Sequence, residues 1–290
     1  MTDPQARTVT VSINGTDVSV EEGATVLDAC GAAGVSTPTL CYAENLTPVN
    51  ACRVCVVEVE KSRTLVPSCS RQVEEGMVVQ TDSERVRHSR KMVLEFLDSG
   101  VDLSQTSDLG DGTLAHWSAE YGVDTSRYGP AAERIDEEIK IQDNLYIRDY
   151  DKCVLCYKCV EACGDDAQHT FAIAVSGRGF GARISTEFDV SLPDSACVYC
   201  GNCVAVCPTN ALQFKTEFDL RQADEWHEEE QTVTRTVCSY CGVGCNLELH
   251  VQDNTIVKVT SPNDHSVTSG HLCIKGRFGW QYVQPTIGRK

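Results

Sequence analysis

Two runs of cysteine residues carry the clearest chemistry in this sequence. Each run has the spacing Cys-x2-Cys-x2-Cys-x3-Cys; the first occupies Cys153–Cys163 and the second occupies Cys197–Cys207, with Pro208 directly after it. Cysteine thiolates ligate iron–sulfur clusters, and this spacing, repeated, is typical of a chain that binds two [4Fe–4S] clusters. Three closely spaced thiolates wrap one cluster, while the fourth thiolate of the run reaches the other cluster.

The spacing therefore predicts two ligand sets that cross between the runs. One [4Fe–4S] cluster is expected on Cys153, Cys156, Cys159 and Cys207, and the other on Cys197, Cys200, Cys203 and Cys163. The alternative is a pair of structural zinc sites in a protein that serves as a scaffold. Structural zinc sites use two separated pairs of cysteines, so the spacing favours the clusters.

Four more cysteines stand nearer the start of the chain, at Cys41, Cys52, Cys55 and Cys69. Their spacing, C-x10-C-x2-C-x13-C, differs from the plant-type pattern C-x4-C-x2-C…C. A predicted strand hairpin precedes them, and a second hairpin, at 54–60 and 65–66, separates the last two groups. We interpret this arrangement as a β-grasp domain that holds one [2Fe–2S] cluster, with a zinc ribbon as the alternative.

Local patterns predict the elements that position these thiols. Alternating apolar residues on both sides of Asn14-Gly15 predict a hairpin, and Thr25 is a candidate N-cap for a short helix. Cys30 lies on that helix and is expected to be a small buried apolar residue rather than a ligand. Apolar residues at helical spacing predict a second helix over 82–98.

The composition limits the class of protein. The chain has 290 residues, 17 cysteines and a formal net charge of −17. The first thirty residues show no signal peptide, and no run of 18 apolar residues occurs. We therefore expect a cytoplasmic protein, and in that reducing compartment clustered cysteines are metal ligands rather than disulfides. The negative charge argues against nucleic-acid binding; it either suits a basic partner surface or serves solubility alone.

Three stretches of the second half have weaker patterns. Residues 177–183 are glycine-rich, and because no βαβ unit surrounds them they are interpreted as a hairpin rather than a phosphate-binding loop. Residues 209–212 are expected to form a short helix after the last cysteine of the second run. The acidic stretch 218–231 predicts a solvated linker or helix face at a domain boundary.

Several of these motifs resemble one family of electron-transfer proteins. The residues Thr39–Tyr42 and Ala51–Cys55 resemble the [2Fe–2S] domain of the large iron–sulfur subunit of complex I. They are similar as well to the same domain of its relatives in NAD-linked formate dehydrogenases and hydrogenases. The run Cys197–Cys203 resembles the corresponding segment of NAD-dependent formate dehydrogenase alpha subunits.

A last group of cysteines, Cys238, Cys241, Cys245 and Cys273, encloses two strand-like runs at 247–251 and 256–259. Together with the residues around it, this group resembles the N-terminal [4Fe–4S] domain of molybdopterin oxidoreductases, formate dehydrogenases above all. The resemblance implies a third [4Fe–4S] cluster on these four thiols. It also implies that Lys275, in the motif C-x-K-G, lies between this cluster and a pterin as an electron relay; the alternative is an ordinary surface lysine.

The middle of the chain departs from that family. In the family, the helix that corresponds to 82–98 leads to a further cluster held by one histidine and three cysteines. Here the loop 99–104 has no cysteine, and none occurs between Cys69 and Cys153. We therefore expect no cluster in this region, although 114–124 still resembles the family's next helix. Residues 133–143 are acidic and predict an exposed connector.

The sequence thus predicts an α+β protein made of five segments. They are a β-grasp [2Fe–2S] domain at 1–80, a helical connector at 81–148, a two-[4Fe–4S] ferredoxin-like domain at 149–217, an acidic linker at 218–232, and a small β-rich [4Fe–4S] domain of the molybdopterin oxidoreductase type at 233–290. The resemblance covers only the electron-transfer arm of the family. Because the molybdopterin catalytic domain is absent from the sequence, no catalytic residue is expected.

The function that the resemblance implies is electron transfer in a cytoplasmic, NAD-linked formate dehydrogenase complex. One [2Fe–2S] cluster and three [4Fe–4S] clusters would relay single electrons between a molybdopterin subunit that oxidises formate and a flavin subunit that binds NADH. The pterin and the flavin would be bound by those partners. The alternative is an electron-transfer subunit of an NAD-linked hydrogenase or a complex-I-like enzyme, which shares the first 215 residues of the pattern.

Overall fold

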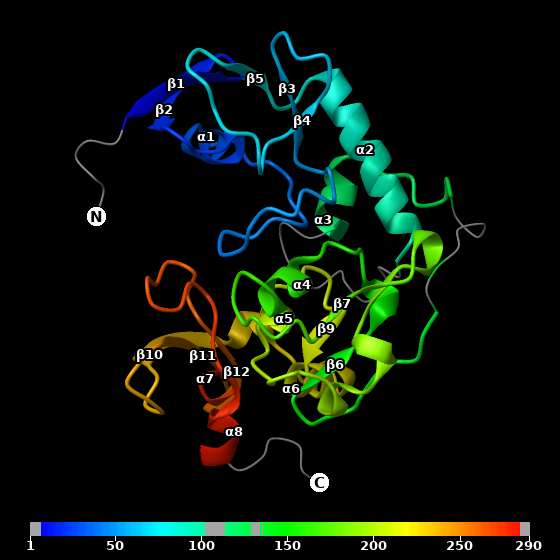
Figure 1. The fold of residues 1–290 in the computed structure, drawn as a ribbon, viewed down its shortest axis with the longest axis vertical. Helices are drawn as coiled ribbons and strands as arrows, with labels where there is room; N and C mark the ends of the chain where they lie inside the picture. The colour runs from blue at the N-terminus through cyan, green and yellow to red at the C-terminus, as the bar shows by residue number, and fades with distance from the viewer. Residues whose placement is uncertain (1–6, 102–113, 129–133, 135, 285–290) are drawn as a thin grey trace. The chain divides into compact units, whose positions relative to one another are not determined.

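The computed structural model describes residues 7–101, 114–128, 134 and 136–284. Its contacts divide the chain into two compact units, and each is described by itself. Unit 1 comprises Met1–Tyr42 and Pro48–Arg134, and unit 2 comprises Ala43–Thr47 and Ile135–Lys290. Both units mix helices with sheets, as the predicted α+β class requires (Figure 1).

Unit 1 is built on a five-stranded sheet in the order β2-β1-β5-β3-β4. The strands are β1 (Thr8–Ile13), β2 (Thr16–Glu21), β3 (Val56–Val59), β4 (Val66–Pro67) and β5 (Val78–Gln80). The predicted hairpin at Asn14-Gly15 is confirmed, because β1 and β2 pair antiparallel and both turn residues have positive φ, 51° and 86°. Strand β5 then pairs parallel to β1.

Helix α1 (Val26–Ala32) packs against this sheet through its apolar side. The predicted N-cap is confirmed: Thr25 accepts a hydrogen bond from the amide of Asp28, whose carboxylate bonds back to the amide of Thr25. This reciprocal arrangement satisfies two amides that a helix N-terminus leaves without partners. Cys30 is fully buried in the apolar core beside Val57 and Val79, in line with its interpretation as a packing residue.

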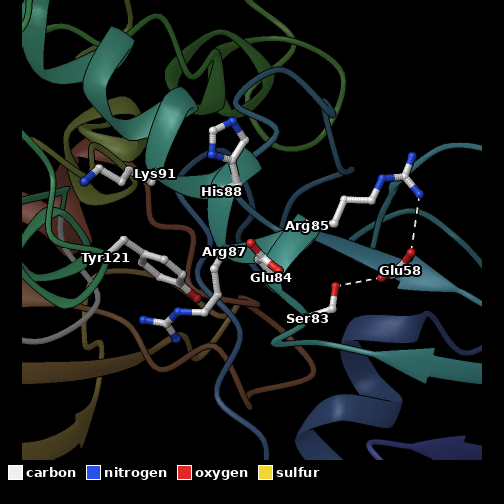
Figure 2. A pocket seen from close by; sticks show the side chains of 8 residues that line it. All are labelled: Glu58, Ser83, Glu84, Arg85, Arg87, His88, Lys91 and Tyr121. Atoms are coloured by element: carbon white, nitrogen blue, oxygen red, sulfur yellow. Dashed lines mark hydrogen bonds and ion pairs between the residues drawn. The ribbon is translucent and has the colours of Figure 1, made fainter.

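Two further helices complete the described part of unit 1. Helix α2 (Glu84–Ser99), with Ser83 as its N-cap, confirms the helix predicted over 82–98, and α3 (Leu114–Glu120) packs against it. A shallow hollow along α2 has a polar lining in which Arg85 bonds to Glu58 (Figure 2). The loop where we expect the family's further cluster to be missing lies at 99–104, of which 102–104 are outside the described residues.

The first half of unit 2 contains short elements around two small sheets. The helices are α4 (Lys158–Cys163), α5 (Asn202–Ala205) and α6 (Lys215–Gln222), and the strands are β6 (Tyr146–Arg148), β7 (Ala174–Ser176), β8 (Arg183–Ser185) and β9 (Leu212–Phe214). Single 3-10 turns occur at Tyr150–Lys152, Gly179–Gly181, Glu187–Asp189, Leu192–Asp194 and Glu228–Glu230. Helices α4 and α5 pack together, and β6 pairs antiparallel with β9.

The glycine-rich stretch between the cysteine runs forms the predicted hairpin, with β7 and β8 antiparallel. Gly177 has a φ of 73°, and a Cβ there would lie 2.4 Å from the carbonyl oxygen of Gly181, so a larger residue cannot close this turn. The short helix predicted at 209–212 is wrong. Residues 208–211 form a turn that leads into β9, because Leu212–Phe214 pair with Tyr146–Arg148 and this pairing overrides the local helical preference.

The acidic stretch predicted as a linker begins inside α6. Glu217 of this helix is buried and forms ion pairs with Lys258 and Arg221, each with an N–O distance of 3.0 Å. Burial alone would raise the pKa of Glu217, but the two cations together outweigh burial and hold the pKa below its usual range. Only the residues after α6 are mostly exposed up to β10. Of the acidic connector predicted at 133–143, residues 133 and 135 lie outside the described residues.

The last part of unit 2 is a three-stranded antiparallel sheet in the order β10-β11-β12. Its strands are β10 (Thr232–Val237), β11 (Asn246–Gln252) and β12 (Thr255–Thr260), and the helices α7 (Ile274–Phe278) and α8 (Trp280–Val283) follow. Strands β11 and β12 confirm the two predicted runs and their turn at Asp253-Asn254. None of the helices in the described ranges is long and apolar enough to cross a membrane.

Candidate iron–sulfur centres

The structure brings together the four predicted [2Fe–2S] ligands of unit 1 as two pairs of thiols. The amide of Cys52 lies 3.5 Å from the sulfur of Cys41, and the sulfurs of Cys55 and Cys69 are also 3.5 Å apart. Cys41, Cys55 and Cys69 are buried, and Cys52 is partly buried. A [2Fe–2S] cluster is held by four cysteine thiolates, so this paired arrangement fits two ligands for each iron.

The pairing changes the acidity of these thiols. The hydrogen bond from Cys52 lowers the pKa of Cys41 to about 5, against the effect of burial. In the same way the bond from Cys69 lowers the pKa of Cys55 to about 6. One thiol of each pair is therefore a thiolate near neutral pH, and the thiolate is the form that binds metal.

Helix α4 and the loop before it place the first predicted cube of unit 2. The sulfurs of Cys153, Cys156, Cys159 and Cys207 line one cavity, with about 350 Å³ of space that protein atoms do not fill. The other walls are apolar or aromatic, and they include Tyr150, Ile184 and Leu212. The amide of Leu212 points at the sulfur of Cys207, 3.4 Å away. Burial raises the pKa of the Cys153 thiol to about 12, and cluster binding would have to remove that proton.

Helix α5 and its loop place the second predicted cube. Cys163, Cys197, Cys200 and Cys203 line another cavity, with about 440 Å³ of unfilled space. The fourth cysteine of each run therefore lies with the first three of the other run, as the spacing predicts. Residues in the left-handed conformation turn both loops around their cavities: Leu155 and Tyr157 in one, and Tyr199 and Gly201 in the other.

Hydroxyl groups and amides surround the second cavity more closely than the first. The hydroxyl of Tyr146 is 3.0 Å from the sulfur of Cys197, and the hydroxyl of Thr170 is 3.4 Å from the sulfur of Cys163. The amide of Ala172 is 3.3 Å from the same sulfur of Cys163. Burial, and then the neighbouring thiols of Cys203 and Cys197, raise the pKa of Tyr146 well above its usual range, so its hydroxyl keeps the proton that it donates.

The last predicted cube has the most open ligands. Cys238 is buried and its amide bonds to the carbonyl of Cys245 at 2.7 Å, whereas Cys241 and Cys273 are exposed. Burial raises the pKa of Cys245, and its three companion thiols add to the effect, which places all four in electrostatic contact. Lys275 lies on α7, two residues after Cys273, and is exposed.

The space between the thiols suits clusters better than single ions. Among the described residues, no three histidine, cysteine or acidic side chains converge on a point where one metal ion would sit. A zinc site needs four ligands at about 2.0–2.3 Å from a single ion. Thiols that line a larger cavity fit a cluster that supplies its own sulfur and iron.

The polar residues that border these cavities were not predicted from the sequence. Tyr146, Arg148, Thr170 and Asn202 are not cysteines and follow no ligand spacing, and Arg277 was not distinguished from the lysine two residues before it. One signal was available: Arg148 and Arg277 are charged residues within otherwise apolar or cysteine-bearing segments, and both are buried. A buried charge needs a compensating partner.

Comparisons with known proteins identify the class of these domains. The family described as "2Fe-2S iron-sulfur cluster binding domain" matches residues 6–84, and "4Fe-4S dicluster domain" matches residues 152–211. The family described as "Molybdopterin oxidoreductase Fe4S4 domain" matches residues 231–285. The chain is therefore an iron–sulfur protein with one [2Fe–2S] domain followed by two [4Fe–4S] domains.

Whole-chain relatives place it further. It is 34% identical over 277 residues to the NADPH-Fe(3+) oxidoreductase subunit alpha of Geobacter sulfurreducens, covering 95% of this chain and 31% of that protein. It is 28% identical over 309 residues to a putative formate dehydrogenase of Staphylococcus haemolyticus, covering 94% of this chain and 31% of that protein. The chain thus spans about a third of the length of these curated relatives.

A solved structure shows the same arrangement. A chain of an NAD+-reducing [NiFe]-hydrogenase in the H2-reduced state matches with a TM-score of 0.63 and 27% identity, over 71% of this chain and 87% of that chain. The protein belongs to the family of iron–sulfur electron-transfer subunits that includes those of NADH-quinone oxidoreductases, putative formate dehydrogenases and NAD-reducing hydrogenases.

Proposed function

We propose that this chain relays single electrons between a molybdopterin subunit that oxidises formate and a flavin subunit that binds NADH. In this proposal Cys41, Cys52, Cys55 and Cys69 hold one [2Fe–2S] cluster, and the three foursomes of unit 2 hold one [4Fe–4S] cluster each. Each cluster takes up or releases one electron, and the flavin collects two for hydride transfer. The cytoplasm, a reducing compartment, is the proposed location.

The observation that carries the choice of a pterin partner is the last cysteine group. Residues 231–285 match a molybdopterin oxidoreductase domain, and a hydrogenase or complex-I relay has no evident use for such a domain. The open side of this group also supports a partner there. Cys241 and Cys273 are exposed, and large apolar residues that are 41–61% exposed stand nearby: Val237, Tyr240, Val243, Val267 and Ile274. Exposed apolar surface of this kind is typical of protein interfaces.

The side chains of this unit would bind, insulate and orient the clusters rather than convert a substrate. The apolar walls of the first two cavities exclude water, and amide and hydroxyl groups donate hydrogen bonds to the sulfurs. Burial and such hydrogen bonds set the potentials of iron–sulfur clusters. Lys275 stands beside Cys273 on the open side, where it would lie between the cluster and the pterin of the partner.

A hydrogenase or complex-I-like relay is the second candidate, and the match to the [NiFe]-hydrogenase chain favours it. The two are separated by purifying the chain with its natural partners. We expect formate-dependent NAD+ reduction and molybdenum or tungsten in the complex. Hydrogen-dependent NAD+ reduction with nickel, or a complex without a pterin, would contradict the proposal. A colourless protein with about one zinc per four cysteines would instead support a scaffold.

A further inference from the structure

The two cavities between α4 and α5 have ligand sets of the same kind but different surroundings. The cavity of Cys153 is lined by no charged side chain among the described residues, and its nearest hydroxyl–sulfur pair, Thr209 with Cys207, is 3.9 Å apart. The cavity of Cys163 has two hydroxyl–sulfur contacts, at 3.0 and 3.4 Å. A ligated thiolate has no proton to give, so in both contacts the hydroxyl donates.

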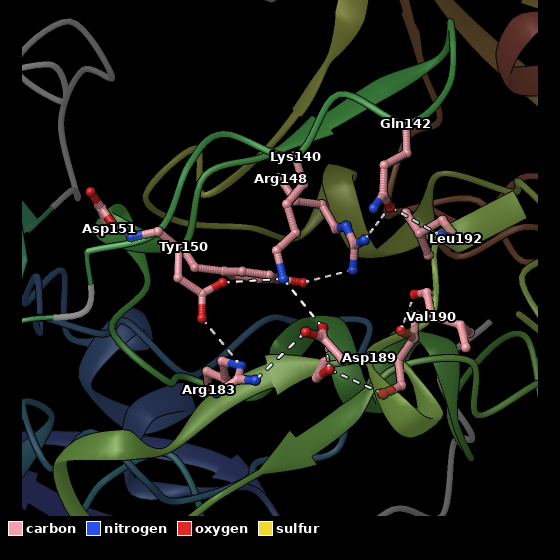
Figure 3. A network of polar contacts seen from close by, with 12 residues as sticks. Lys140, Gln142, Arg148, Tyr150, Asp151, Arg183, Asp189, Val190 and Leu192 are labelled. Carbon is pink, nitrogen blue, oxygen red and sulfur yellow. Dashed lines mark hydrogen bonds and ion pairs between the residues drawn. The ribbon is translucent and has the colours of Figure 1, made fainter. Parts of the chain in front are cut away.

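Arg148 adds a positive charge to the Cys163 cavity. It is one of the residues that line that cavity, and it is buried. Its guanidinium donates to the hydroxyl of Tyr150 at 3.3 Å and to the side-chain oxygen of Gln142, and both partners are neutral (Figure 3). In the same network Lys140 and Arg183 are paired with Asp189, whereas Arg148 forms no ion pair within the described ranges.

Arg277 adds a second positive charge from α7. It is 1% exposed, and it packs on the loop that carries Cys200, because a Cβ added to Gly201 would lie 3.3 Å from the Cγ of Arg277. Its guanidinium donates to the side-chain oxygen of Asn202 at 3.0 Å and to the carbonyl of Val259 at 3.2 Å. No carboxylate pairs with it in the part of the chain that the structure describes, so its counter-charge must come from elsewhere.

The thiols supply that counter-charge. Burial lowers the pKa of Arg277 to about 10, and the groups that oppose this effect are Cys200, Cys203 and Cys273. A cationic guanidinium in an apolar interior is costly unless an opposite charge lies close. Four thiolates bound to iron provide a negative charge, and it grows by one on reduction. Arg148 and Arg277 therefore favour the reduced state of the cluster beside them.

We propose that the cluster held by Cys163, Cys197, Cys200 and Cys203 has the higher reduction potential of the two in this domain, and that Tyr146, Thr170, Arg148 and Arg277 cause the difference. This inference rests on the proposed electron-transfer function. A single electron that arrives at the pair is then held mainly at this cluster, and the donor centre is oxidised by that one electron. Arg277 also lies close to Cys273, so it favours the reduced state of the last cluster as well.

Tyr146→Phe and Thr170→Val test the hydroxyl donors with little change of shape. The iron-loaded full chain is titrated with a reductant while electron paramagnetic resonance follows each cluster. We expect each variant to lower the higher of the two midpoint potentials and to leave the lower one in place. A tenfold change in the equilibrium constant corresponds to 59 mV for one electron. Thr209→Val, at the Cys153 cavity, is the matched control and should leave the higher potential unchanged.

A further variant tests the arginine. Arg277→Gln removes the charge and keeps a polar side chain, and in iron-replete protein it should lower two potentials, that of the Cys163 cluster and that of the last cluster. If Tyr146→Phe and Thr170→Val move the lower of the pair, or move neither, the inference is overturned while the relay function stands. If the full chain shows no [4Fe–4S] signal at all, the proposed function itself fails.

Discussion

The guanidinium of Arg277 and the side-chain oxygen of Asn202 lie 3.0 Å apart in the interior of unit 2. The same oxygen accepts a second hydrogen bond from the amide of Leu272, also at 3.0 Å. Asn202 is the first residue of α5, and Leu272 directly precedes Cys273. One amide oxygen thus joins the loop of the second predicted cube to the loop of the last.

Replacing that oxygen should weaken unit 2. Asn202→Ala leaves the buried Arg277 and the amide of Leu272 without an acceptor, at a cost of about 1–3 kcal/mol in the free energy of unfolding. Asn202→Asp keeps an acceptor for both and serves as the matched control. Thermal unfolding of the iron-loaded chain measures the difference. Equal transition temperatures for Asn202→Ala and the unaltered protein would show that this contact contributes nothing.

A second buried arginine ties together the described elements of unit 1. Arg90 of α2 donates to the carbonyl of Val56 at 2.9 Å and to the hydroxyl of Tyr121 at 2.6 Å. Hydrogen bonds to charged groups contribute about 1.5–3 kcal/mol. Tyr121→Phe should therefore lower the free energy of unfolding by that amount. Tyr128→Phe, on a half-buried ring that stacks on Phe96, is the control and should have a smaller effect in the same denaturation experiment.

Local signals and long-range contacts account for what the sequence could and could not predict. The turn at Asn14-Gly15 and the cap at Thr25 depend on neighbouring residues, and both were predicted. Arg90 contacts Val56 from 34 positions away, and Arg277 contacts Asn202 from 75 positions away, so no local pattern shows either contact. The helix expected at 209–212 failed for the same reason, because β9 forms with a strand far earlier in the chain.

The cysteine sets were predictable because cluster ligands follow fixed spacings, and these spacings survive differences in the surrounding sequence. What surrounds each set was not, since hydroxyl donors and buried cations reach the sulfurs from other elements. Tyr146 stands on β6, 51 positions before Cys197. The predicted identity of the clusters thus came from spacing alone, whereas the proposed difference between them came only from the folded structure.

Asp98 gives unit 1 a pH-dependent stability. Burial raises the pKa of this carboxyl from its ordinary value of 3.8 to about 6, while the Ser118 hydroxyl acts in the opposite direction. The folded state therefore binds the proton more tightly than the unfolded chain does. The stabilisation is fully present below the unfolded value and is lost as the pH rises through the folded value.

Asp98→Asn removes this dependence. Above a pH of about 6 the variant should be more stable than the unaltered protein, by up to about 3 kcal/mol from the difference between the two pKa values. The advantage should shrink as the pH falls toward the unfolded value. Denaturant titrations at several pH values measure it. An advantage of the same size at every pH would contradict the prediction, because it would come from packing rather than from ionisation.

The crossed ligand sets predict which substitutions affect the same cluster. Cys163→Ser and Cys200→Ser should alter one paramagnetic signal, and Cys156→Ser should alter a different one, although Cys156 is much nearer to Cys163 in the sequence. Cys30→Ala is the control, because Cys30 lies in the apolar core of unit 1 and should leave every signal in place. If Cys163→Ser and Cys156→Ser alter the same signal, each run holds its own cluster and the crossed assignment is wrong.

Lys275 tests the direction in which the relay points. Lys275→Met keeps the length of this exposed side chain but removes its charge, and in the complex with the pterin partner it should slow reduction of the clusters by formate about tenfold, which corresponds to about 1.4 kcal/mol in the barrier. Iron content should not change, and Lys275→Arg should retain part of the rate. Lys61→Met, at an exposed lysine of unit 1, is the control. Rapid-mixing absorbance measurements follow the reduction. An unchanged rate in Lys275→Met would make this residue an ordinary surface lysine, and it would leave the open thiols of Cys241 and Cys273 as the route to the partner.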